Sequence, residues 1–210
     1  MQPTLTVRAH ALLFSLALML TCGFATAEPL QSWNPGPAKQ AILNFVKQTT
    51  DKASPQFVPP AERIATFDQD GTLWVEQPMY SQVMYVLESV PALLKAKPEL
   101  AKVAPFSTVM EVLKGDHAAM KKLTEEDLLK LVAATSTGIS EESFSADAKK
   151  WIAAAKDPRW KRPYTELTYL PMQELLAYLR VSGYKTYIVT GGGQDFVRAY
   201  AEKTYGVPPE

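Results

Sequence analysis

The spacing of apolar residues predicts a helix near the start of the chain and two short buried strands. Apolar residues recur at helical spacing after Pro37, a residue suited to the first turn of a helix, so residues 37–50 are expected to be helical. Residues 63–67 and 186–190 are short, mostly apolar runs, and the second is uncharged and rich in β-branched residues. Such runs are typical of strands buried in a parallel sheet.

The C-terminal part of the chain predicts two more helices. Apolar residues lie on one helical face between Pro171 and Gly183, and a tight turn is expected at residues 191–193. Residues 194–205 are then predicted to form a single helix that Gly206 closes. Strands that alternate with helices through short connections indicate an α/β fold with a parallel sheet.

Between the two strands lies a block of about 80 residues, 80–162, with a helical pattern and no strand pattern. Its first apolar stripe is predicted to end at Pro91. Ser107, Thr124 and Ser145 are predicted to cap three further helices, because each precedes a periodic apolar run. The block is therefore interpreted as a helical insertion into the α/β unit and not as a second domain in tandem.

The first 27 residues have the composition of a targeting segment. They contain no Asp or Glu, and their apolar run, residues 11–20, is about half as long as a membrane-spanning helix. Small residues at positions 25 and 27 then form a cleavage pattern, so residues 1–27 are predicted to be a signal peptide cut before Glu28. The protein is expected to be periplasmic or secreted, with no membrane attachment after cleavage. A buried N-terminal helix and a lipoprotein signal at Cys22 are the alternatives.

Composition excludes several classes of protein. Hydrophobic residues make up 47% and charged residues 21% of the chain, as in ordinary globular proteins and unlike disordered, collagen-like or polytopic membrane chains. Lys and Arg number 22, as do Asp and Glu, so the basic excess of a nucleic-acid-binding protein is absent and no such partner is expected. One cysteine and two histidines exclude a disulfide framework and a zinc finger. The oligomeric state stays open.

Two aspartates, Asp68 and Asp70, follow the first predicted strand. Residues two apart on an extended segment point the same way, so both carboxylates are expected at the carboxyl end of the strand, where open α/β sheets bind ligands. Their mutual repulsion calls for a proton or a cation between them. Without a nearby Lys or Arg, Mg²⁺ is the natural partner because it prefers oxygen ligands. A turn with solvated acids is the alternative. A calcium loop is disfavoured because Met79 stands where that loop needs a glutamate.

These residues match a known family. Residues 67–74, Phe-Asp-Gln-Asp-Gly-Thr-Leu-Trp, resemble the first motif of the haloacid dehalogenase-like hydrolase superfamily, and residues 187–193 resemble its second, an apolar strand ending in Thr or Ser. A longer match that includes Tyr80 and Gln82 resembles a phosphoserine-phosphatase-like branch of exported members.

The resemblance implies a fold and a division of the chain. A Rossmann-like parallel sheet core is expected from residues 28–79 and 163–210, with residues 80–162 as an all-helical cap inserted after the first motif. The later core strands of the family are not found in the chain. The expected fold class is therefore α/β with a capped and incomplete core.

The resemblance also implies a reaction, the Mg²⁺-dependent hydrolysis of a small phosphorylated metabolite. Asp68 would be the nucleophile that forms an aspartyl-phosphate, and Asp70 the general acid and base. Asp68 would bind Mg²⁺ through its side chain and Asp70 through its carbonyl. Thr190 would hydrogen-bond a phosphoryl oxygen, assisted by the backbone N–H groups of Gly191 and Gly71.

Two motifs of the family are not found. The third supplies a Lys or Arg and the fourth an acidic pair, and neither Lys185 nor Lys203 stands where the third is expected. We therefore expect a C-terminal truncation, with little or no activity in the 210-residue chain. The alternatives to a hydrolase are a truncated non-catalytic remnant or phospho-ligand binding module, and a phosphotransferase that uses the same residues.

Other polar and aromatic residues are weaker candidates for the site. His117 is expected to be an exposed surface histidine, and Arg162 either meets an anionic substrate or lies at a hinge or on the surface. Glu76 and Gln77 follow the first motif closely and are candidates to face the pocket, whereas Trp74 is predicted to be a core residue.

Overall fold

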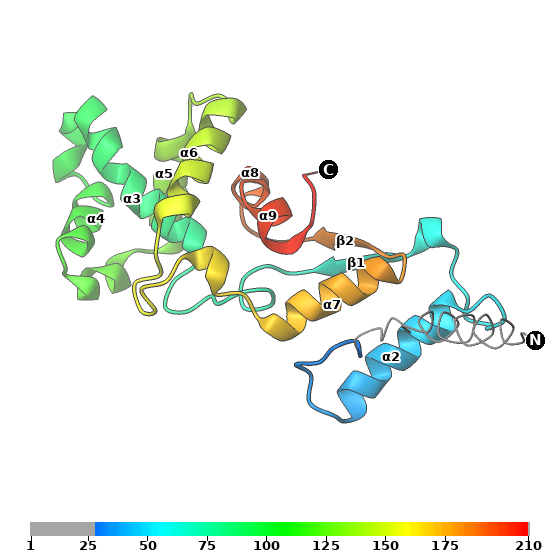
Figure 1. Cartoon of the computed structure of the whole chain (residues 1–210). Helices are drawn as coiled ribbons and strands as arrows, with labels where there is room; N and C mark the ends of the chain where they lie inside the picture. Colours follow the sequence, from blue (N-terminus) through cyan, green and yellow to red (C-terminus); the bar gives the residue numbers. More distant parts are fainter. Residues whose placement is uncertain (1–27, 210) are drawn as a thin grey trace, which may run out of the picture.

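A computed structural model describes residues 28–209 and contains a parallel sheet of two strands (Figure 1). Strand β1 (Ile64–Phe67) pairs with β2 (Lys185–Ile188) so that Ile64 lies opposite Lys185 and Phe67 opposite Ile188. The pairing extends past the strands, because the N–H of Val189 donates to the carbonyl of Phe67 at 2.8 Å. Both strands therefore end at the same edge of the sheet, as a parallel α/β core requires.

Four helices accompany the sheet. In the view of Figure 1, α2 (Pro37–Thr50) and α7 (Leu170–Val181) lie below the strands, while α8 (Gln194–Arg198) and α9 (Ala201–Tyr205) lie above them. Val46 of α2 and Leu179 of α7 form a buried cluster with Tyr184, against which Ala65 and Phe67 of β1 pack. These helices thus bury part of the apolar surface of the sheet, although Ile64 and Val189 stay exposed and the strands are less buried than predicted. The predicted α/β class is confirmed.

The segment between the strands is helical. It contains α3 (Ser81–Ala96), α4 (Phe106–Leu113), α5 (Glu125–Ser136) and α6 (Glu141–Ala154), joined in part by short 3₁₀ turns. Residues 81–154, all of them described, contain no strand. Side chains of α3, α4 and α5 form a cluster of their own around Leu87, Val109 and Leu131, each fully buried. The boundaries 28–79, 80–162 and 163–210 stay predictions.

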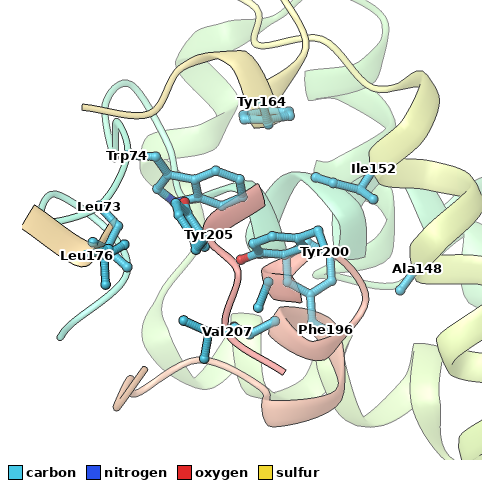
Figure 2. Packing of buried hydrophobic residues seen from close by; sticks show 12 residues of the cluster. Leu73, Trp74, Ala148, Ile152, Tyr164, Leu176, Phe196, Tyr200, Tyr205 and Val207 are labelled. Carbon is cyan, nitrogen blue, oxygen red and sulfur yellow. The ribbon is translucent and has the colours of Figure 1, made fainter. Parts of the chain in front are cut away.

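A third hydrophobic cluster joins this helical segment to the core around Trp74 (Figure 2). The indole of Trp74 is fully buried and stacks on Tyr200, with ring centroids 4.7 Å apart. Ala148 and Ile152 of α6 belong to the same cluster as Phe196 of α8. One end of the helical segment therefore shares its buried surface with the core.

Some predicted helix boundaries were wrong. Helix α3 does not end at Pro91 but runs to Ala96, because Leu93 and Leu94 beyond the proline still pack on the buried cluster of the segment. Helix α4 begins at Phe106 with Pro105 before it, so Ser107 lies inside the helix and is not its cap.

Two further corrections concern α6 and the last helix. Helix α6 begins at Glu141, where the Ser140 hydroxyl accepts the N–H of Ser143, so Ser145 is an interior residue. Residues 194–205 form two short helices, because the chain turns at Tyr200, which has a φ of −137° and directs its ring into the Trp74 cluster. The Thr124 cap, by contrast, was correct, and Asp127 completes a capping box there.

The predicted signal peptide, residues 1–27 with Cys22, lies outside the described residues. None of the helices in residues 28–209 has the length and apolar character needed to cross a membrane.

Candidate active site

The three polar residues of the turn after β1 differ in how deeply they are buried. Asp68 is exposed, Gln69 is buried and Asp70 is half-buried. Gln69 points into the core, where its Nε2 donates to the hydroxyl of Tyr205 at 2.8 Å. The N–H of Leu73 donates to the Gln69 carbonyl at 2.9 Å and closes the turn. Gln69 therefore anchors the turn, while the two aspartates face the same space, as the spacing of two predicted.

That space is a cavity of ≈ 610 Å³ at the carboxyl ends of both strands. Acidic side chains of the turn form one side of it, and residues 190–193 after β2, called the glycine loop here, form another. Helices α3 and α5 contribute a largely apolar wall. The lining residues are Asp68, Asp70, Glu76, Tyr80, Gln82, Val83, Val86, Leu129, Val132 and the glycine loop.

The surroundings of Asp70 favour its protonated form more than water does. Its Oδ1 accepts a hydrogen bond from the Nε1 of Trp74 at 2.8 Å. Burial raises the pKa of Asp70 above its ordinary value, and the charges of Asp68 and Glu76 act in the same direction, while the Trp74 hydrogen bond opposes them. A carboxyl group with a raised pKa can donate a proton to a leaving group and accept one from water.

The glycine loop presents hydrogen-bond donors to the cavity. The hydroxyl oxygen of Thr190 accepts the N–H of Gly192 at 3.2 Å, which leaves the hydroxyl proton of Thr190 to donate elsewhere. The N–H of Gly191 has no partner within residues 28–209. Both residues line the cavity that contains Asp68. These two donors suit an anionic oxygen, and the role of Thr190 and Gly191 in binding phosphate stays a prediction.

Gly71 does not fit its predicted role. Its N–H donates to the carbonyl of Trp74 at 3.0 Å and is therefore engaged within the turn, and Gly71 is not among the cavity lining. The residue adopts a φ of +73°, and a Cβ there would lie 2.9 Å from the carboxylate of Glu76. Glycine is needed at this position for the turn and for the approach of Glu76, because a side chain would meet both a strained backbone and this contact.

Comparison with known families agrees with this geometry. A sequence model of the haloacid dehalogenase-like hydrolases matches residues 65–208, which is more than half of the chain and includes every residue that lines the cavity. The chain belongs to the haloacid dehalogenase-like hydrolase family. A search of curated proteins found no match. The match supports a hydrolase that acts on a small molecule, and the phosphoserine-phosphatase-like branch stays a prediction.

The oxygen ligands of this haloacid dehalogenase-like site fit Mg²⁺. Within residues 28–209, no three His, Cys, Asp or Glu side chains form a group that could hold a metal ion by themselves. Mg²⁺ is usually bound by one or two carboxylates and completes its shell with waters and substrate phosphates. The Asp68 carboxylate and the Asp70 carbonyl, beside a cavity open to a phosphate, meet that requirement.

Cationic side chains are absent from the cavity lining as the structure describes it. Arg162, a candidate for anion binding, is exposed and pairs with Glu166 at 3.4 Å, and His117 is exposed as predicted. Glu76 lines the cavity but Gln77 does not. Gln82 belongs to the longer sequence motif and had no predicted role, although it lines the cavity and contacts the glycine loop.

We expect the Asp70→Asn variant to be more stable than the wild type at neutral pH and to lose this advantage in acid. Because burial raises the folded-state pKa of Asp70 above 3.8, the folded protein gains stability from this group below that value and loses it as pH rises through the raised pKa. Asparagine stays neutral and its oxygen still accepts from Trp74. Urea unfolding of both proteins, at pH values from below 3.8 up to neutral, measures the difference in the free energy of unfolding.

The control for this prediction is Asp147→Asn, which removes an exposed carboxylate from α6. It should show no comparable gain at neutral pH. If Asp70→Asn lowered the free energy of unfolding equally at neutral and acid pH, the raised pKa would be wrong.

Proposed function

We propose that this haloacid dehalogenase-like hydrolase is a Mg²⁺-dependent phosphomonoesterase that forms an aspartyl-phosphate and acts on a small phosphorylated metabolite. The observation that carries the proposal is one cavity in which the Asp68 carboxylate, the carboxyl group of Asp70 with its raised pKa, and the donors of the glycine loop converge. A nucleophile, a proton donor and an oxyanion site are the parts that phosphoryl transfer needs.

The first half-reaction uses both aspartates. An Asp68 oxygen attacks phosphorus as the bond to the substrate oxygen breaks, and Asp70 donates its proton to that oxygen, which leaves as an alcohol. The raised pKa of Asp70 supports this role because it shifts the carboxyl group toward its protonated form. The Thr190 hydroxyl and the Gly191 N–H stabilise the negative charge on the phosphoryl oxygens.

The second half-reaction regenerates the protein. Water attacks phosphorus while Asp70, now ionised, accepts its proton, and the bond between phosphorus and Asp68 breaks. Inorganic phosphate leaves, and both aspartates return to their starting states. The indole N–H of Trp74 holds the Asp70 carboxyl group in one orientation through both halves.

The charges of the site support a role for magnesium. Asp68, Glu76 and a phosphate dianion would meet in a cavity whose described lining contains no Lys, Arg or His. Mg²⁺, held by the Asp68 carboxylate and the Asp70 carbonyl, would supply the positive charge that offsets the repulsion between nucleophile and phosphate.

We also propose a compartment. The composition of residues 1–27 supports export to the periplasm or the medium by a cleaved signal peptide. A phosphatase there would act on metabolites outside the cell membrane, with no nucleic-acid partner expected from its neutral charge balance.

A second candidate function is a phospho-ligand binding module without turnover. The observation that favours it is the same lack of a cationic side chain in the described lining, because a cation normally offsets the charge of the transferring phosphoryl group. In this case the glycine loop would bind phosphate, and Asp68 would not be phosphorylated.

Metal removal tests the proposal. We expect slow phosphate release from an aryl phosphate with Mg²⁺, loss of release with EDTA, and recovery when excess Mg²⁺ is returned, because the site has no other described source of positive charge. Phosphate is measured colorimetrically, and thermal unfolding with and without EDTA checks that the fold persists. Release that EDTA leaves unchanged contradicts the magnesium requirement. Phosphate binding without any release favours the binding module.

A further inference from the structure

Gln82 connects the helical segment to the glycine loop. It lies in the first turn of α3, and its Oε1 accepts the N–H of Gly193 at 2.7 Å, across 111 residues of sequence. The side chain is half-buried and lines the same cavity as Asp68 and Thr190. It is thus a polar residue of α3 held against the loop that is proposed to bind phosphate.

The glycines of the loop fit closely around this side chain. A Cβ at Gly193 would lie 2.6 Å from the Nε2 of Gln82, and a Cβ at Gly192 would lie 2.9 Å from its Oε1. The backbone of Gly193 has φ −68° and ψ 123°, a conformation open to any residue. A Cβ at position 193 would therefore displace the Gln82 amide from the loop, although the backbone conformation itself does not require glycine.

The contact also determines which donors of the loop stay available. Gly193 donates to Gln82, and Gly192 donates to the Thr190 oxygen. The donors left for a phosphoryl oxygen are the N–H of Gly191 and the hydroxyl of Thr190. Without Gln82, the Gly193 N–H would lose its hydrogen-bond partner. The glycine loop would then lose its hydrogen bond to α3.

We infer that Gln82 is a positioning residue, which fixes the glycine loop so that Gly191 and Thr190 face the phosphate beside Asp68. The inference rests on the proposed function, because it assigns the loop to phosphate. It also links α3 to the reaction: Val83 and Val86 of the same helix line the cavity, so the wall that meets the rest of the substrate also holds the loop.

Kinetics of the Gln82→Met variant test this role. Methionine keeps the length of the side chain but replaces the amide oxygen with a weakly accepting thioether sulfur. We therefore expect KM for the aryl phosphate to rise about five- to tenfold, the range of one lost hydrogen bond, with kcat nearly unchanged. The same variant should bind inorganic phosphate more weakly by a similar factor, as measured by ³¹P NMR titration. Ser89→Ala, which removes a hydroxyl bonded only within α3, is the matched control and should change neither value.

A double-mutant cycle tests the contact itself. Gly193→Ala places a Cβ against Gln82, so phosphate affinity should fall about tenfold in the wild-type background. In the Gln82→Ala background the obstacle is gone, and adding Gly193→Ala should change affinity by less than about twofold. Urea unfolding of the four proteins gives a second measure of the same coupling that does not depend on turnover.

The possible outcomes distinguish a failure of the positioning role of Gln82 from a failure of the proposed function. If the wild type releases and binds phosphate but Gln82→Met leaves KM and phosphate affinity unchanged, the positioning role is wrong and the proposed function stands. If Gly193→Ala has the same effect with and without Gln82, the contact does not control the loop. If the wild type neither binds nor releases phosphate, the proposed function fails, and the positioning role fails with it.

Discussion

The Asp68→Asn variant is expected to lose covalent phosphorylation and, with it, phosphate release from an aryl phosphate. An amide cannot attack phosphorus as a carboxylate does, and removal of a covalent nucleophile lowers turnover by more than about 1,000-fold in other hydrolases. The protein is incubated with Mg²⁺ and a radiolabelled phosphomonoester and quenched in acid, and the label retained by the protein is counted. Peptide mass spectrometry then locates the phosphate, which is expected on Asp68.

The matched control is Glu76→Gln. This change removes one negative charge from the same cavity but leaves the nucleophile in place, so the label should be retained. Because Asp68 is exposed and its carboxylate accepts only the neighbouring Gln69 N–H at 2.7 Å in the described structure, Asp68→Asn should leave the free energy of unfolding close to that of the wild type. Equal labelling of Asp68→Asn and the wild type would exclude Asp68 as the nucleophile.

The parts of the site that follow strands could be predicted from the sequence. Asp68 and Thr190 come just after two short apolar runs, and the ends of parallel strands meet at one edge of a sheet. Local pattern and sheet geometry therefore suffice to bring the residues together. The cavity lining that contains both, with Asp70 and Gly191, agrees with that expectation.

The errors arose where tertiary packing overrode local signals. Pro91 is a strong signal for a helix end, yet the partly buried Leu93 and Leu94 beyond it pack on the cluster of the helical segment, and α3 continues to Ala96. Ser145 precedes an apolar run, yet α6 begins earlier, after Ser140, and Ala148 and Ile152 of this helix pack in the Trp74 cluster. Tyr200 breaks a helical pattern because its ring stacks on Trp74, which lies 126 positions earlier in the chain.

The contacts of the site that cross between elements were the hardest to foresee. Gly71 was predicted to bind phosphate from its place in a motif, but its N–H donates to the carbonyl of Trp74. The Glu76 carboxylate occupies the space that a Cβ of Gly71 would need. Gln82 and Gly193 stand far apart in the sequence, and neither carries a periodic or spacing signal that pairs them. Contacts of this kind depend on how the helical segment docks, which single-sequence patterns do not encode.

The Trp74→Ala variant is expected to lower the free energy of unfolding by about 3–5 kcal/mol, the usual effect of deleting a fully buried aromatic side chain. The indole stacks on Tyr200, meets the edge of Tyr205 and lies 6.2 Å from the Tyr164 ring, so its loss leaves a cavity where the helical segment meets the core (Figure 2). Such a loss is a large part of the stability of a typical domain. Urea unfolding followed by far-UV circular dichroism measures it.

Trp160→Ala is the control, since it removes the same side chain from an exposed loop where 47% of the residue is accessible and should change stability by less than about 1 kcal/mol. Trp74→Phe tests the hydrogen bond from the indole N–H separately from the packing of the ring. Phenylalanine fills much of the site but has no N–H, so Asp70 loses the hydrogen bond that lowers its pKa, and that pKa should rise further. Unfolding of Trp74→Ala at the same urea concentration as Trp160→Ala would show that Trp74 does not hold the cluster together.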